Sequence, residues 1–179
     1  MPDETLERNK GIVRRMLKAF NDGDTASVAE LLHPSIRDHS RMLGLEPSIR
    51  RAPVVKRVQT EIMREKEAFP DKRFKEEFIV AEGDRVVLRW SMTGTHQGRF
   101  VGRGATGKKV SISGTEFVRI QDGKIIEHDD DPLHVLELLA QLDMLDQQTL
   151  ALPEFSHDRV SPRRNDAAPG RGGPPPAGT

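Results

Sequence analysis

Four polar side chains interrupt the apolar faces of three strand-like segments in the second half of the chain. Apolar and polar residues alternate in these segments, so every second side chain points to the same face of the predicted sheet. The segments span residues 84–96, 108–121 and 124–130. The polar residues that share the apolar faces are His96, Glu116, His128 and Asp130. A polar group on a buried face must be paired or take part in chemistry, so we interpret these four as candidate catalytic residues.

Residues of these types suit acid/base chemistry near neutral pH. An imidazole that a carboxylate orients is a common general base, and a carboxylate on a buried face either finds partners or has a raised pKa. Within DDDP at 129–132, the alternation favours Asp130 as the inward acid, because Asp131 suits the cap of a following helix. The alternative for Glu116 is a structural ion pair, and the alternative for each histidine is a core position satisfied by backbone carbonyls.

Metal and phosphate chemistry have no motif in this sequence. No pair of the candidate residues has the spacing of a recognised metal motif such as HExxH, so we expect no metal site. The segment GRGATG at 102–107 lacks the Lys-Ser/Thr and the strand-to-helix context of a phosphate loop, and it is typical of a hairpin connection. His39, in IRDHS at 36–40, is a weaker candidate that we place with substrate binding.

The composition narrows the possible partners. The sequence has 179 residues, and its 28 basic residues equal its 28 acidic ones, so we expect neither nucleic acid nor an acidic membrane as partner. The absence of cysteine excludes disulfides, thiolate nucleophiles and cysteine zinc sites. The charged N-terminus lacks the apolar core of a signal peptide, and no apolar run approaches the roughly 20 residues of a membrane span. We therefore expect a soluble cytoplasmic protein.

The order of the predicted elements indicates an α+β fold. Apolar residues at helical spacing predict helices over residues 4–21 and 53–68, with a short helix capped by Asp24 between them. Residues 35–52 lack periodicity and are predicted to form a loop, and Asp131 and Pro132 open a final helix. The predicted strands span 73–81, 84–96, 108–121 and 124–130. This order favours helices packed on the concave face of a curved antiparallel sheet, with a pocket between them.

Two parts of the chain differ in composition. Residues 1–152 are long enough for one domain with a sizeable core. From residue 153 to 179 the chain is polar and rich in proline and glycine, and it ends in GRGGPPPAGT. Such a segment cannot bury enough apolar surface to fold, so we predict a disordered tail there.

Four segments together resemble the SnoaL-like polyketide cyclase (ester cyclase) family of the NTF2-like superfamily. They are FPDKRF at 69–74, EGDRVVLRWSMTGTHQGRF at 82–100, GKKVSISGTEFVRIQDGKIIEH at 107–128 and LELLAQL at 136–142. The resemblance covers about residues 5–145. It implies a cone-shaped α+β barrel with a deep apolar pocket, usually as a homodimer or higher homo-oligomer.

The resemblance also implies an activity and a set of site residues. Members of this family close a ring by intramolecular aldol condensation of a polyketide ester in secondary-metabolite biosynthesis, with neither a metal nor an organic cofactor. An aspartate on the last strand acts as acid and base, and Asp130 best matches that position. His96 would hold the oxygen that develops charge, and Glu116 with His128 would tune Asp130. The residues expected to contact a small hydrophobic, polyketide-like substrate are His39, Trp90, Met92, Ile112 and Val118.

Two other functions fit the same residues. Relatives of this fold open epoxides to give a cyclic ether or a diol, for which Asp130 and His96 would form the acid/base pair. The chain reads HDD at 128–130 where many family members read HWD, and Trp90 is its one tryptophan. The sequence therefore gives less support for a large flat substrate that stacks on aromatic rings, and more support for an epoxide substrate. The second alternative is a non-catalytic NTF2-like module that binds a small ligand, with its polar groups satisfied in pairs.

Overall fold

One curved sheet with helices on its concave face makes up the fold. The computed structural model describes residues 2–40 and 47–145. The strands are β1 (Leu32–Asp38), β2 (Arg73–Glu82), β3 (Arg85–Thr95), β4 (Lys109–Gln121) and β5 (Lys124–Asp130). They form one sheet in the order β1-β5-β4-β3-β2, in which β1 runs parallel to β5 and the other pairs are antiparallel. The helices are α1 (Pro2–Asp22), α2 (Thr25–Leu31), α3 (Pro47–Arg50), α4 (Val54–Ala68) and α5 (Leu133–Gln141).

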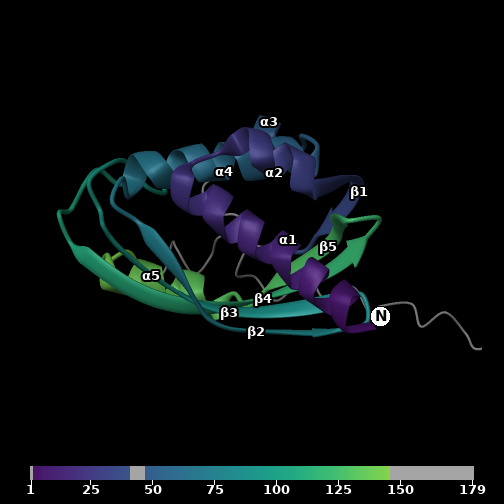
Figure 1. The fold of residues 1–179 in the computed structure, drawn as a ribbon. Helices are drawn as coiled ribbons and strands as arrows, with labels where there is room; N and C mark the ends of the chain where they lie inside the picture. Colours follow the sequence, from purple (N-terminus) through teal and green to yellow (C-terminus); the bar gives the residue numbers. More distant parts are fainter. Residues whose placement is uncertain (1, 41–46, 146–179) are drawn as a thin grey trace, which may run out of the picture.

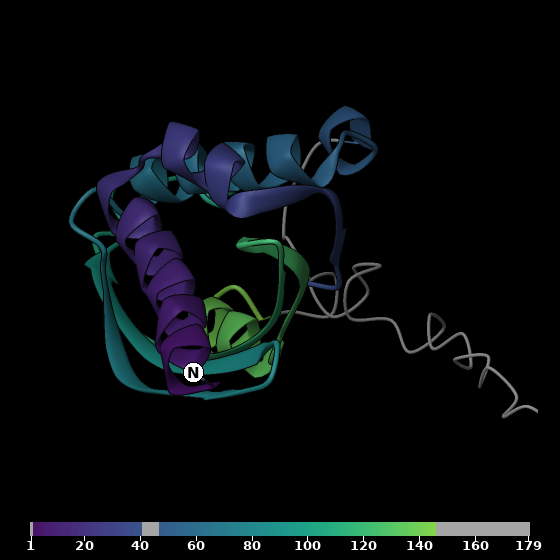
Figure 2. The ribbon, with the colours of Figure 1, turned by 45° about the vertical axis from the view of Figure 1, so that its right-hand side comes forward.

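The sheet curls around the helices and encloses the core. Figures 1 and 2 show α1 lying across the hollow of the sheet, with α2 and α4 closing the opposite side. Helix α1 contacts β2 and β3, and α5 contacts β4. The α+β fold with helices on the concave face is therefore confirmed.

The buried faces of β3 and β4 follow the predicted alternation. Four residues of β3 point into the core, namely Val86, Leu88, Trp90 and Met92. Four apolar residues of β4 do the same, namely Val110, Ile112, Val118 and Ile120. Glu116 shares this face, since it lies two residues from Val118 and opposite Leu88 in the register.

Tight turns join the antiparallel strands where they were predicted. Asp122 and Gly123 link β4 to β5 with φ angles of 52° and 73°. Positive φ at both central residues is the geometry whose twist matches a β-hairpin, and aspartate followed by glycine tolerates it best. Asp24 caps α2, and its side chain accepts hydrogen bonds from the backbone N–H groups of Ala26 and Ser27.

The loop predicted for residues 35–52 is wrong at residues 35–38 and 47–50, and residues 41–46 lie outside the described residues. Residues 32–38 form β1, which pairs with β5 so that Asp38 lies opposite His128, and residues 47–50 form the short helix α3. In β1 only Leu32 and Ile36 are buried, so the strand lacks the alternation that marks β3 and β4. This edge strand forms because it pairs with β5, which is about 90 residues away in sequence, so no local pattern predicts it.

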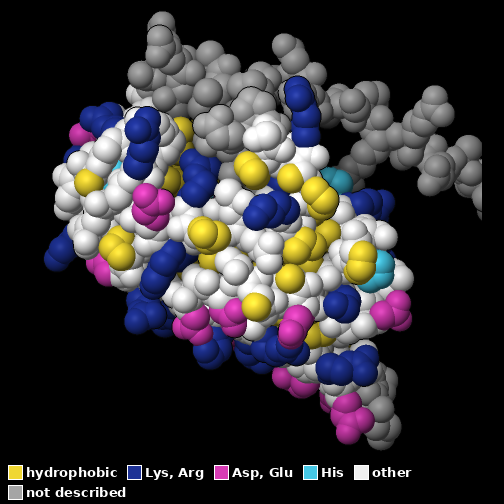
Figure 3. Space-filling view, turned by 90° about the horizontal axis from the view of Figure 1, so that it is seen from above, with side chains coloured by type: hydrophobic (Ala, Val, Ile, Leu, Met, Phe, Trp, Pro, Cys, Tyr) yellow, Lys and Arg dark blue, Asp and Glu magenta, His cyan; other side chains and the backbone are white. Residues whose placement is uncertain are grey.

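Two further expectations concern the surface and the end of the chain. On the face seen in Figure 3, basic and acidic side chains are interspersed. Among the described residues, no helix is both long and apolar enough to cross a membrane. The tail predicted for residues 153–179 lies outside the described residues.

Candidate active site

A cavity of about 180 Å³ lies between the concave face of the sheet and helices α1, α4 and α5. Its wall is mostly apolar, and aromatic rings form much of it: Phe20, Phe69, Phe74, Trp90 and Phe100. The predicted contact residues Trp90, Met92, Ile112 and Val118 all belong to this lining. Their contact with a substrate stays a prediction, but the strands do bring them together.

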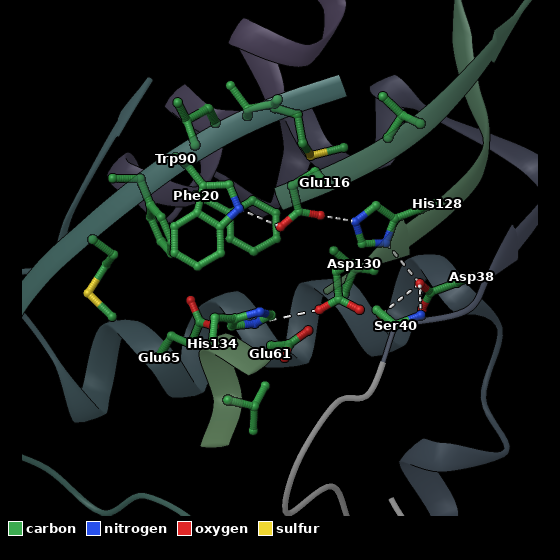
Figure 4. A pocket seen from close by; sticks show the side chains of 18 of the residues that line it. Phe20, Asp38, Ser40, Glu61, Glu65, Trp90, Glu116, His128, Asp130 and His134 are labelled. Atoms are coloured by element: carbon green, nitrogen blue, oxygen red, sulfur yellow. Dashed lines mark hydrogen bonds and ion pairs between the residues drawn. The ribbon is translucent and has the colours of Figure 1, made fainter. Parts of the chain in front are cut away.

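A chain of hydrogen bonds crosses one side of the cavity (Figure 4). The indole Nε1 of Trp90 donates to Glu116 Oε1 at 2.8 Å, and the other oxygen of Glu116 bonds Nε2 of His128. Nδ1 of His128 lies 3.0 Å from Oδ1 of Asp38. Ser40 completes the chain, because its hydroxyl donates to the same Asp38 oxygen at 2.7 Å. The chain therefore links strands β1, β3, β4 and β5.

His128 is a fixed cation at the centre of this chain. Burial alone would lower its pKa, but the negative charge of Glu116 and the hydrogen bond with Asp38 outweigh burial and raise the pKa well above 6.5. Burial would likewise raise the pKa of both carboxyls, yet their interactions with His128 hold the pKa of Glu116 and of Asp38 below the usual values. Both ring nitrogens of His128 therefore donate to carboxylates, so this side chain has no free nitrogen with which to accept a proton.

Gly114 makes room for the first bond of the chain. It lies opposite Trp90 in the β3–β4 register, and a Cβ atom at this position would lie 2.4 Å from Cζ2 of the indole ring. A glycine here lets the ring lie across β4, where Nε1 reaches Glu116 two residues further along the strand.

Asp130 is the carboxyl that differs from the paired acids. Its side chain ends β5, lines the cavity and is 10% exposed. Oδ2 lies 3.5 Å from Nε2 of His134, and Oδ1 is buried with no hydrogen-bond partner in the described part of the chain. Burial, followed by the negative charge of Glu116, raises the pKa of Asp130 to about 6. This carboxyl can therefore both release and accept a proton near neutral pH.

A second charged pair lies elsewhere on the cavity wall. Nζ of Lys72 lies 2.5 Å from Oε2 of Glu65, and the lysine side chain is 1% exposed. The ammonium group also lies 5.8 Å and 5.4 Å from the ring centroids of Phe20 and Phe74. The Glu65 carboxylate is therefore engaged by a cation.

The structure does not bring His96 to Asp130. His96 is fully buried and lies just beyond the end of β3, and it is not part of the cavity lining. Its ring packs against Phe69 with 5.3 Å between the centroids, and Nδ1 lies 2.9 Å from the hydroxyl of Thr106. The alternation that put His96 on the apolar face is obeyed, and its backbone still bonds Lys108 and Gly107, but its ring lies beside Phe69 and outside the cavity lining.

His39 also lies apart from the cavity. Its side chain is 50% exposed, and Nε2 is 3.2 Å from Oε1 of Glu127. It adjoins Asp38 in sequence, but alternation along the strand sends the two side chains to opposite faces. The predicted contact between His39 and a substrate therefore has no support in this geometry.

The polar lining residues that sequence reasoning missed include Asp38, Glu61 and His134. Asp38 follows Ile36 at strand spacing, but this spacing is informative only if the segment is recognised as a strand, and β1 was not predicted. Glu61 lies three residues after Val58 on α4, so an acid on the apolar stripe of that helix was visible in the sequence. Within residues 2–40 and 47–145, no three His, Asp or Glu side chains are arranged to hold a metal ion.

Comparison with known proteins identifies the family. Residues 10–142 match the SnoaL-like polyketide cyclase family. The chain belongs to this family. It is 34% identical over 127 residues to the aklanonic acid methyl ester cyclase DnrD of Streptomyces peucetius, covering 68% of this chain and 81% of DnrD. It is 33% identical over 118 residues to the nogalonic acid methyl ester cyclase of Streptomyces nogalater, covering 65% of this chain and 84% of that enzyme.

Solved structures show the same fold. AclR of Streptomyces galilaeus, a proposed hydroxylase, matches with a TM-score of 0.64 and 31% identity. The match covers 79% of this chain and 88% of AclR. The SnoaL-like cyclase resemblance expected from the four sequence segments is therefore confirmed.

Proposed function

We propose that this protein is a cyclase that closes a ring on a polyketide-derived methyl ester by intramolecular aldol condensation, without a metal or an organic cofactor. The observation that carries the proposal is Asp130, a buried carboxyl with one oxygen free of protein partners in an aromatic-lined cavity. The similarity to two methyl ester cyclases adds the class of substrate.

Asp130 supplies the base that the reaction needs. Its carboxylate removes a proton from the carbon next to the ester group, and the resulting enolate carbon attacks a ketone carbon of the same molecule. A pKa of about 6 suits this step, because the group is mostly ionised at neutral pH and is a stronger base than an exposed aspartate. The apolar wall keeps water from competing for the enolate.

The hydrogen-bonded chain and the rings hold the substrate in place. The cation of His128, fixed between Asp38 and Glu116, anchors the ends of β1 and β5 beside Asp130. The indole of Trp90 is held by Glu116 and stands edge-on to Phe74, with 5.2 Å between ring centroids. Rigid aromatic walls of this kind suit a planar aromatic polyketide and limit it to one orientation.

The similarity to two methyl ester cyclases favours aldol ring closure over epoxide opening. Epoxide opening needs an acid at the epoxide oxygen and a base at the attacking hydroxyl, and His96 with Asp130 were the predicted pair. His96 lies outside the cavity lining, so this pair is not assembled. The predicted homodimer and cytoplasmic location stay predictions.

Purified protein is expected to convert aklanonic acid methyl ester to an isomer. An aldol ring closure adds and removes no atoms, so the product has the mass of the substrate and a different retention time in liquid chromatography with mass detection. The assay is run in buffer extracted with a chelator, where the rate is expected to be unchanged. A product heavier by one water or one oxygen atom, or a rate that needs added metal, would contradict the proposal.

A further inference from the structure

Glu61 is a second acid in the cavity that none of the described hydrogen bonds engages. It lies on α4 between Val58, which is buried, and Glu65, and it lines the cavity. Figure 4 shows its carboxyl turned toward the same region as the carboxyl of Asp130. None of the hydrogen bonds or ion pairs found among the described residues involves the Glu61 side chain.

The other acids of the cavity already have partners. Glu65 is paired with Lys72, while Asp38 and Glu116 are both bonded to His128. Asp130 keeps one oxygen without a partner, and Glu61 has no hydrogen bond or ion pair among the described residues, so both carboxyls offer oxygens to a ligand. Oδ1 of Asp130 is buried without a partner in the described part of the chain, which is costly, and such groups are retained where they serve binding or catalysis.

Glu61 differs from Asp130 in its protonation. Burial raises its pKa well above the usual 4.5, and the negative charges of Glu65, Asp38 and Asp130 raise it further, against the opposing charge of His128. Two neighbouring carboxyls in one apolar space do not both ionise readily. The base and the acid of a proton-transfer reaction are therefore present as separate groups.

Resting on the ring closure proposed above, we propose that Glu61 is the acid partner of Asp130: its carboxyl donates a proton to the ketone oxygen that becomes a hydroxyl when the new carbon–carbon bond forms. Asp130 takes the carbon-bound proton, the enolate carbon bonds the ketone carbon, and the electron pair of the C=O bond moves to oxygen. That oxygen takes the proton of Glu61. Transfer of the proton from Asp130 to Glu61 then restores both groups, so the substrate is isomerised and nothing is consumed.

Substitution of Glu61 by glutamine separates the two proton transfers. The amide keeps the shape of a protonated acid but cannot release a proton, so ring closure of aklanonic acid methyl ester is expected to slow by roughly 100-fold or more. Exchange of the carbon-bound proton in deuterated water, followed by proton NMR above the buffer rate, is expected to continue because it needs only Asp130. Glu67→Gln is the matched control, since Glu67 is an exposed acid on the same helix.

The outcomes distinguish the two proposals. Wild-type protein that neither exchanges nor cyclises the ester would overturn the proposed function itself. If wild type cyclises the ester, a Glu61→Gln variant that cyclises it at the wild-type rate, or that loses exchange and ring closure together, would overturn the role of Glu61. A substrate-free measurement adds a second test: the infrared difference between wild type and Glu61→Gln at neutral pH is expected to show the carbonyl stretch of a protonated carboxylic acid, and its absence would also overturn the role.

Discussion

The Asp130→Asn variant is expected to turn over the methyl ester at least roughly 100-fold more slowly than wild type. Asparagine has nearly the shape of aspartate but cannot accept a proton, so the enolate no longer forms. The melting temperature is expected to hold or to rise, because burial disfavours the ionised carboxylate that the substitution removes. Steady-state kinetics together with a thermal melt check both parts of this prediction.

The control for this variant is Asp122→Asn, which makes the same chemical change in an exposed turn. Asp122 has a φ of 52°, a conformation that asparagine also adopts readily, so both activity and stability are expected to stay near wild type. Normal turnover by Asp130→Asn would remove Asp130 from the mechanism. A large fall in the melting temperature would instead assign Asp130 a structural role.

The His128→Leu variant is expected to show the largest loss of stability, about 3–5 kcal/mol in the free energy of unfolding. Removing the imidazolium leaves Asp38 and Glu116 buried without their shared cation. Adding Asp38→Asn and Glu116→Gln to this variant is expected to restore part of the loss, because both remaining charges are then removed. Urea unfolding of the single and triple variants gives the comparison.

His39→Ala is the matched control for this loss. His39 also contacts a carboxylate, Glu127, but its own side chain is 50% exposed and that of Glu127 is 31% exposed, so the change is expected to stay within about 0.5 kcal/mol. A His128→Leu variant as stable as His39→Ala would show that the imidazolium does not balance the two buried carboxylates.

The stability of this triad depends on pH in both directions. The pKa of His128 is raised in the folded protein, so its contribution is complete below about 6.5 and is lost as the pH rises through the folded value. The pKa values of Asp38 and Glu116 are lowered, so their contribution is present above their usual values and is lost as the pH falls through the folded ones. The triad therefore stabilises the fold most between these limits.

Local sequence patterns predicted most of the sheet and part of the polar residues of the candidate site. Alternation in β4 placed Glu116 on the concave face, because this strand has one face in the core and one outside it. In β5, His128 and Asp130 line the cavity as predicted, but Ile125 lies there in place of Ile126, because the β4–β5 register shifts beside it. The same rule misled for His96, since a period of two says nothing about where a strand ends. Strand β3 ends at Thr95, and the side chain of the next residue packs beside Phe69, outside the cavity lining.

The remaining residues depend on contacts between distant parts of the chain. Asp38 belongs to an edge strand that exists only through its pairing with β5, and its partner His128 is 90 residues away. Glu61 lies on a helix whose apolar stripe was predicted, but only the packing of α4 over the sheet brings it to the cavity that Asp130 lines. Such long-range pairings are not encoded in any short window of sequence.

The dependence of kcat/KM on pH tests most directly whether a buried Asp130 is the base of this enzyme. This quantity reports the ionisation of essential groups in the free enzyme, and a base must lose its proton before it can act. With aklanonic acid methyl ester, the rate is expected to rise with pH through a midpoint at about 6. A rate that does not change with pH in this range, or a midpoint near 3.8, the ordinary value of an aspartate, would contradict the account.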